Sequence, residues 1–245
     1  FKYILLKEDV IMNNFTFYAP TYFAFGKGKE KDVAKYVKRF GGSKVLVHYG
    51  GGSVKRSGLY DSVVNALKAD NIPFVELGGV KPNPRSGLVY EGIDLCRKEK
   101  VDFILALGGG SVIDSGKAIA LGVKYDGDFW DFYEGKEATD ALPVGTVLTI
   151  AAAGSEGSTS SVITKEEGML KRGAGGEALR PVFSILNPEF TCSLPPYQTA
   201  AGATDIMVHV TERYFSNTKE VEITDRLCEA VLKTMIKEVP RVIAD

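Results

Sequence analysis

Cysteine and histidine are scarce in this sequence. Its 245 residues include three cysteines and two histidines. Cys96, Cys192 and Cys228 are odd in number and far apart, and they form no CxxC pair. This argues against a disulfide framework and against a zinc site built from thiolates. Cysteines used in this way are typical of a reducing compartment, so we expect a cytoplasmic protein.

Long apolar runs and blocks of like charge are also missing. No apolar run approaches the roughly 20 residues that span a bilayer, so we expect no membrane partner. The 30 basic and 31 acidic residues give a net charge of -1, which does not suggest a nucleic-acid partner. Residues 1–11 carry charges and lack a small-residue cleavage site, so they make a poor signal peptide. We expect an extension ahead of Met12, although an edge strand fits the same residues.

Strands and helices are predicted to alternate over the first three quarters of the chain. Apolar segments predict strands over residues 15–25, 44–48, 73–77, 102–107 and 143–150. Helices are predicted over residues 30–40, 57–69 and 86–100, the last with Ser86 as its N-cap. The segment 102–107 is continuously apolar, as expected for a strand buried on both faces of a parallel sheet. The alternation predicts an α/β fold with a Rossmann-like parallel sheet.

The pattern changes in the last third of the chain. Residues 162–185 predict a hairpin with its turn in the glycines at 173, 175 and 176. From Tyr197 to the end only helical patterns follow, so we place a domain boundary near 190–196. The predicted organisation is an α/β domain over residues 12–194 and a helical segment over residues 195–245.

A run of three glycines follows the predicted strand 102–107 and leads directly into a helix. Glycines let the backbone approach a ligand closely, and a helix N-terminus offers free N–H groups and a partial positive charge to a phosphate. Ser111 and Asp114 are spaced to form a capping box. A tight, well-capped turn is the alternative, but the position after an apolar strand favours phosphate binding. The spacing is neither GxGxxG nor a P-loop.

A second glycine-rich loop, YGGGSVKR over residues 49–56, also follows a strand. Two such loops on neighbouring strands could hold the two ends of one dinucleotide. This loop has no acid for the ribose hydroxyls before Asp61, and Ser53, Lys55 and Arg56 suit a 2′-phosphate. The pattern therefore favours NADP over NAD, unless Lys55 and Arg56 are merely solvated. The small residues over 149–158 form a third, weaker indication of a nearby ligand.

Asp205 and His209 are four residues apart in a helical region, so their side chains share one face. A carboxylate and an imidazole at this spacing suit a divalent metal. A salt bridge or a helix cap is the alternative when the spacing is considered alone.

Several motifs in a fixed order resemble the iron-containing (group III) alcohol dehydrogenases, in particular the butanol dehydrogenase and aldehyde reductase branch. They are PTYFAFGKG (20–28), YGGGSVKRSGLYD (49–61), GVKPNPRSGLVYEG (79–92), ALGGGSVIDSGKAIA (106–120), LTIAAAGSE (148–156) and NPEFTCSLPPYQTAAGATDIMVH (187–209), followed by TERY. The resemblance extends from about Met12 to Asp245.

The resemblance implies a dehydroquinate-synthase-like architecture, in which an α/β nucleotide-binding domain precedes an all-helical metal-binding domain. It also implies a nicotinamide cofactor, NADP or NAD, beside Fe²⁺ or Zn²⁺, and a homodimer or higher homo-oligomer. The residues expected to bind the cofactor are Gly109, Gly110 and Ser111 at the pyrophosphate, Gly51, Gly52 and Ser53 near the adenosine ribose, Thr149, Ser158 and Lys171 at the adenine, ribose or phosphates, and Asp114. Asp205 and His209 would be the first two metal ligands.

The chain departs from the family in its histidines. The family uses one aspartate and three histidines as ligands, whereas this chain has two histidines in all, and His48 lies at a strand end on the wrong side of the fold. The chain also ends at Asp245, after about two helices of the second domain. We expect a truncated gene product or a fragment, which would hold a metal weakly and leave an apolar helical surface uncovered.

The predicted activity is hydride transfer between the nicotinamide and a small alcohol or aldehyde such as butanol or butanal. The metal would polarise the carbonyl group, and no nucleophile is required. A nucleotide-binding fragment or assembly module without catalysis is the alternative. A glycerol dehydrogenase or a dehydroquinate-synthase-like enzyme is a distant third possibility, against which PPYQTAAGATDIMVH argues.

Overall fold

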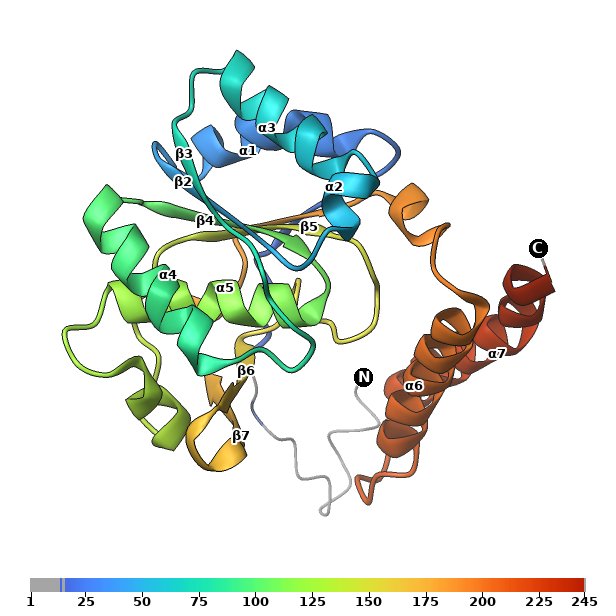
Figure 1. The fold of residues 1–245 in the computed structure, drawn as a ribbon. Coiled ribbons are helices and arrows are strands. Elements are labelled where there is room, and N and C mark those ends of the chain that lie inside the picture. The colour runs from blue at the N-terminus through green and yellow to red at the C-terminus, as the bar shows by residue number, and fades with distance from the viewer. Residues whose placement is uncertain (1–13, 15, 245) are drawn as a thin grey trace.

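A six-stranded parallel sheet forms the centre of the molecule (Figure 1). The computed structural model describes residues 14 and 16–244. The strands are β1 (Tyr22–Phe25), β2 (Val45–Tyr49), β3 (Phe74–Leu77), β4 (Phe103–Gly108), β5 (Val144–Leu148) and β8 (Phe183–Leu186), in the order β1-β8-β5-β4-β2-β3. All five pairings are parallel, which confirms the predicted α/β fold. Of the predicted strand over 15–25 only β1 forms, and the expectation for residues 1–11 lies outside the described residues.

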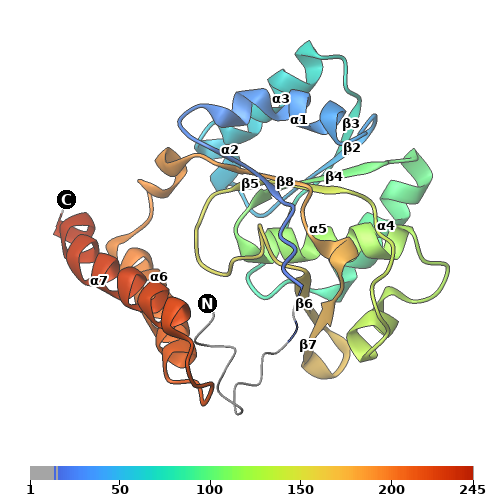
Figure 2. The ribbon, with the colours of Figure 1, turned by 180° about the vertical axis from the view of Figure 1, so that it is seen from behind.

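Helices cover both faces of the sheet (Figures 1 and 2). The helices α1 (Val33–Arg39), α2 (Ser53–Arg56) and α3 (Leu59–Ala69) lie on one face, and α4 (Ser86–Glu99) and α5 (Gly110–Val123) lie on the other. On the first face, the sheet packs against α1 and α3 in a core cluster that includes Val37 and Leu59. On the second face, it packs against α4 and α5 in another core cluster, which includes Val89 and Ile119. Every residue of β4 is buried, as its apolar sequence predicts.

A two-stranded antiparallel sheet lies beside α4 and α5. It consists of β6 (Ser160–Lys165) and β7 (Leu170–Gly175). The predicted hairpin over 162–185 is therefore wrong in extent, because β8 leaves it and joins the main sheet. Its turn is also wrong, because it lies at the 3-10 helix Glu167–Met169 and not at the later glycines. Gly168 supplies the positive φ of 74° that such a tight turn favours.

The N-terminus of α4 is capped from this hairpin and not by the serine that the sequence suggests. Ser86 is the first residue of the helix, and Arg85 at the N-cap makes no side-chain cap. The carboxylate of Glu166 instead accepts a hydrogen bond from Gly87 N at 3.0 Å, and Glu166 N donates to Ser86 Oγ at 3.3 Å. The two residues thus bond reciprocally, as in a capping box, but Ser86 and Glu166 are 80 residues apart in the sequence.

We predict that Glu166→Ala lowers the free energy of unfolding by about 1 kcal/mol, the usual effect of losing a helix cap. Urea denaturation followed by circular dichroism measures the change. Glu167→Ala, one residue further along the exposed turn, is the matched control and should be neutral. Equal stability of the two variants would show that Glu166 does not cap α4.

The last two helices form an antiparallel pair at one side of the α/β part (Figures 1 and 2). They are α6 (Pro196–Tyr214) and α7 (Glu222–Ala244), and they confirm the helical pattern predicted after Pro196. A strap containing the 3-10 helix Pro188–Thr191 connects them to β8. Among the residues that the structure describes, no helix combines the length and apolarity that a membrane crossing requires.

Candidate functional site

The carboxyl ends of β2 and β4 form a switch point in the sheet. These strands are neighbours, but β2 continues into α2 and α3 on one face, whereas β4 continues into α5 on the other. The two outgoing connections therefore separate at this edge of the sheet, which is where doubly wound sheets bind ligands. The loops 50–52 and 108–109 both emerge there. The sequence indicated that the two glycine-rich loops follow neighbouring strands. The pairing of β2 with β4 confirms that these strands are neighbours.

The glycines after β4 lie so close to the loop after β5 that side chains do not fit. A Cβ on Gly109 would lie 2.4 Å from Cγ2 of Ile150, and a Cβ on Gly110 would lie 2.7 Å from Cβ of Ala153. Thr149 N donates to Gly108 O at 3.1 Å, which holds the two loops together. Gly110 and Ser111 open α5, so their N–H groups have no acceptor within the helix. The result is a narrow backbone cradle at a helix N-terminus, which fits a phosphate.

Asp114 does not form the predicted capping box. The N-cap of α5 is Gly109, and no side chain caps it. Asp114 instead accepts hydrogen bonds from Ser155 Oγ at 2.6 Å and from Val162 N at 3.1 Å. Burial raises the pKa of this carboxyl above its ordinary value, while these donors oppose the shift. Asp114 therefore joins α5 to the loop after β5, and the capping interpretation is wrong because long-range partners occupy its oxygens.

The loop after β2 has an acidic neighbour that its own sequence does not contain. Pairing of β2 with β3 brings Glu76 beside Val47, and Glu76 accepts a hydrogen bond from Tyr49 OH at 3.1 Å. Lys55 Nζ lies 4.0 Å from the Glu76 carboxylate and stands over the rings of Tyr49 and Tyr60. Lys55 is thus already partnered, and the sequence argument for a 2′-phosphate now depends on Ser53 and Arg56.

The remaining predicted cofactor residues lie at different depths. Gly51 and Gly52 are exposed in the loop after β2, and Ser53 opens α2. Ser158 Oγ lies 3.3 Å from the buried Nζ of Lys117, so it contacts the interior of its loop. Lys171 on β7 donates to Asn83 Oδ1 at 2.8 Å, in the loop before α4.

Lys117 is the functional candidate that sequence reasoning missed. It lies on α5, is fully buried, and donates to three backbone carbonyl groups of the loop after β5. Burial lowers its pKa to about 8. The available signal was a lysine among the apolar and small residues of GKAIALG, where a solvated charge is not expected.

Asp205 and His209 lie on one face of α6, as their spacing predicts. Nε2 of His209 is 3.6 Å from Oδ2 of Asp205, and Nδ1 is 3.7 Å from Oε2 of Glu212. A Cβ on Gly202 would lie 3.8 Å from Ala151 O, so the same helix meets the loop after β5. Within the described residues, no group of three or more histidine, cysteine or acidic side chains is arranged to hold a metal ion. The pair supplies suitable donor types, but it does not complete a metal site.

The other histidine has a structural role. His48 is completely buried, with Nδ1 2.9 Å from Leu77 O and Nε2 2.9 Å from Ser115 Oγ. Burial lowers its pKa to about 4, so the ring is neutral near pH 7. It joins β2, β3 and α5 within the core.

Comparison with known families gives a match over most of the chain. The family model described as iron-containing alcohol dehydrogenase matches residues 20–188. The chain belongs to the iron-containing alcohol dehydrogenase family. The cradle after β4 and the loops beside it lie within the matched family region, whereas Asp205 and His209 follow it.

Named relatives align with nearly the whole chain. A probable NADH-dependent butanol dehydrogenase 2 of Bacillus subtilis is 52% identical, with 96% of this chain and 60% of the relative covered. The NADPH-dependent aldehyde reductase YqhD of Escherichia coli is 38% identical, with 96% and 60% covered. The crystal structure of NADH-dependent butanol dehydrogenase A from Thermotoga maritima has a TM-score of 0.91 at 42% identity, with 96% and 59% covered. The chain thus spans about 60% of the length of the curated relatives it matches.

Proposed function

We propose that this chain forms the cofactor-binding part, and supplies the first two metal ligands, of an NAD(P)H-linked alcohol dehydrogenase or aldehyde reductase. The expected substrate is a small alcohol or aldehyde such as butanol or butanal. The observation that carries the proposal is the cradle of Gly109 and Gly110, which admits only backbone next to Ile150 and Ala153. Membership of the iron-containing family and the butanol dehydrogenase relatives support it.

The residues of the cradle would bind and orient the cofactor. N–H groups at the start of α5 would hold the pyrophosphate, and the loop 50–53 would lie at the adenosine ribose. The nicotinamide, when bound, supplies the hydride or accepts it. NADH and NADPH both suit this arrangement. Ser53 and Arg56 favour NADPH, although the partnering of Lys55 by Glu76 removes part of that argument.

Asp205 and His209 would provide two of the donors to a divalent metal, Fe²⁺ or Zn²⁺. Such an ion serves as a Lewis acid for a substrate oxygen in dehydrogenases of this kind. The other ligands would have to come from outside the described residues, because these contain no group of three suitable side chains. An intact nucleotide cradle beside an incomplete metal site favours a second candidate, a nucleotide-binding module without catalysis.

This chain alone, with its incomplete metal site, should give little turnover when Fe²⁺ or Zn²⁺, NADPH and butanal are added. In the metal-loaded protein that includes the remaining ligands, we expect reduction of butanal, and a loss of at least about 100-fold in Asp205→Ala and His209→Ala. Turnover, calorimetric metal binding and calorimetric binding of NADH and NADPH should be measured on each variant. Both variants should still bind the nucleotide, because the cradle lies on other elements. Asp140→Ala, which removes an exposed acid paired with Lys124, is the matched control.

These measurements separate the two candidates. Nucleotide binding without metal binding or turnover would favour the module. Failure of the unaltered protein to bind either nucleotide would reject both candidates. The ratio of the two nucleotide affinities tests the preference for NADPH.

We also propose a homodimer or higher homo-oligomer. β1 is an edge strand of the sheet, and it exposes the side chains of Phe23 and Phe25. Exposed edge strands with apolar side chains are ready sites for association. Analytical ultracentrifugation tests this, and a monomer at micromolar concentration would contradict it.

A further inference from the structure

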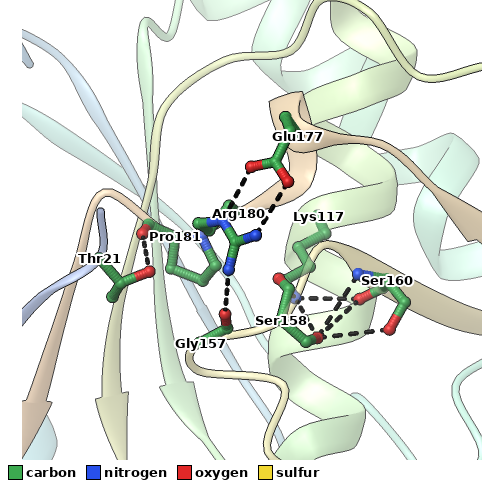
Figure 3. Close-up of polar contacts among 8 residues, drawn as sticks. All are labelled: Thr21, Lys117, Gly157, Ser158, Ser160, Glu177, Arg180 and Pro181. Carbon is green, nitrogen blue, oxygen red and sulfur yellow. Dashed lines mark hydrogen bonds and ion pairs between the residues drawn. The ribbon is translucent and has the colours of Figure 1, made fainter. Parts of the chain in front are cut away.

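The loop after β5 is held through its own carbonyl groups. Between Ser155 and Ser160, five backbone carbonyl oxygens accept hydrogen bonds from side chains of other elements. Figure 3 shows the contacts of Gly157, Ser158 and Ser160. The pairs are Ser155 O, Ser158 O and Ser160 O with Lys117 Nζ, Gly157 O with Arg180 Nη1, and Glu156 O with Ser184 Oγ. Four of these groups lie in the irregular segment before β6, where no helix or strand ladder satisfies them, so side chains determine its shape.

Lys117 is the central anchor of this loop. Its Nζ lies 2.7, 2.9 and 2.9 Å from the three carbonyl oxygens, and the hydroxyl of Ser158 lies 3.3 Å away. A buried ammonium is costly unless its hydrogens are paired, and here oxygen atoms from one short loop surround it. The charged groups around it are Asp114 on the same helix, Glu156 on the loop and Arg180. With a pKa near 8, it carries its full set of three donors at neutral pH.

Arg180 is the second anchor, and it reaches the loop from the segment before β8. Its Nε and Nη2 donate to the two carboxylate oxygens of Glu177, each at 2.9 Å. This fork fixes the guanidinium plane, and the remaining Nη1 donates to Gly157 O at 2.8 Å. Figure 3 shows that Lys117 and Arg180 approach the loop from different elements.

The anchored loop leads directly into the proposed cofactor site. Ala153, two residues before the anchored stretch, lies against Gly110 of the cradle, and Ala151 lies against α6. A change in the loop between 155 and 160 therefore alters both the wall of the cradle and the surface met by the helix of Asp205 and His209.

We propose that Lys117 and Arg180 are positioning residues that fix the loop after β5 in the shape required for nicotinamide cofactor binding. This inference rests on the proposed function. Neither side chain needs to touch the cofactor, because both act on the backbone of residues 155–160.

The test compares Lys117→Met, which keeps the length of the side chain but removes its charge and donors, with Lys124→Met. Lys124 is the C-cap of the same helix, is half exposed and pairs with Asp140. We expect Lys117→Met to weaken NADH binding by at least about 10-fold in calorimetry. Amide hydrogen exchange of residues 151–161 should accelerate by about 10-fold, while exchange in β4 stays unchanged. Lys124→Met should change neither quantity.

Chemical rescue separates positioning from packing. Lys117→Ala removes three carbons and the ammonium, and propylammonium has this composition. We expect propylammonium to restore NADH affinity and loop protection in Lys117→Ala. Tetramethylammonium should restore neither, because it has the charge but no N–H donors. Rescue by both cations, or by neither, would overturn the role of the donated hydrogen bonds.

The outcomes also separate this inference from the proposed function. If the unaltered protein binds neither NADH nor NADPH, the proposed function fails, and with it the cofactor role of the anchors; if it binds only NADPH, the same comparisons are made with NADPH. If the unaltered protein binds NADH and Lys117→Met binds equally well with unchanged loop exchange, only the anchoring inference fails. If Lys117→Met does not fold, Arg180→Gln decides. We expect it to weaken NADH binding by about 3-fold and to loosen the loop, and unchanged values would overturn the inference.

Discussion

Replacing Gly109 with valine is expected to lower the affinity for NADH by about 100-fold. The backbone here passes so close to the loop after β5 that even a Cβ would lie 2.4 Å from Cγ2 of Ile150. Valine adds two further methyl groups to this contact, so the backbone at the start of α5 has to move, and its first N–H groups, where the pyrophosphate is expected, move with it. Losing two hydrogen bonds to a charged group costs roughly 3 kcal/mol, which corresponds to about 100-fold in affinity.

The measurement is calorimetric titration with NADH, with circular dichroism to show that the fold is retained. Gly175→Val is the matched control, because Gly175 lies exposed on β7 and a Cβ there meets no atom within 4 Å. Native affinity in the Gly109 variant would remove the cradle from the proposed site. A similar loss in both variants would point to a general effect of valine and not to the cradle.

Replacing Phe183 with alanine is expected to lower the free energy of unfolding by about 3–5 kcal/mol. Phe183 is completely buried on β8 and stacks on Phe103 and Phe40, with ring centroids 5.8 and 5.9 Å away. A Cβ on Gly145 would lie 2.3 Å from its ring, so the neighbouring strand is already shaped around it. The packed sheet cannot collapse into the space that the ring leaves, and this places the loss at the upper end for core substitutions.

Phe17→Ala provides the matched control, because Phe17 is 84% exposed and belongs to no strand. Its substitution should change stability by less than about 0.5 kcal/mol. Urea denaturation of both variants, with the same spectroscopic signal, gives the comparison. A loss below about 1 kcal/mol for Phe183→Ala would mean that this cluster does not hold the sheet together.

The sequence predicts well those parts of the fold that depend on residues close together in the chain. The apolar run before Gly108 predicts a strand buried on both faces, and the glycines at its end predict the start of α5. Helices after Pro196 follow from periodicity alone. In each of these cases the burial or the bend of the backbone is determined by residues within about one turn or one strand.

The parts that sequence missed depend on contacts between distant residues. Glu76 reaches the loop after β2 only because β2 pairs with β3, and Glu166 reaches α4 only because the hairpin packs beside it. Asp114 has the spacing of a capping residue, but Ser155 and Val162 take its oxygens. No local pattern contains these partners, so the capping box and the absence of an acid near the loop were natural but incorrect inferences.

The candidate metal site shows the same division. The four-residue spacing of Asp205 and His209 places both side chains on one face of α6, and the structure agrees. Their role as metal ligands stays a prediction, because a complete ligand set depends on residues that local spacing does not specify. For Lys117, the sequence shows a lysine among apolar and small residues, but it does not show the carbonyl groups that the lysine contacts.

The position of β1 in the sheet has a consequence for synthesis of the protein. Among the described residues, β1 forms one edge of the main sheet and pairs only with β8, and Thr21 bonds to Pro181, 160 residues later. At roughly 5–20 residues per second, about 10–30 s separate the emergence of these two segments from the ribosome. During that interval Tyr22, Phe23 and Phe25 have no sheet to join. The nascent chain is therefore exposed to aggregation, and a chaperone that covers its N-terminal aromatic segment would raise the yield of folded protein.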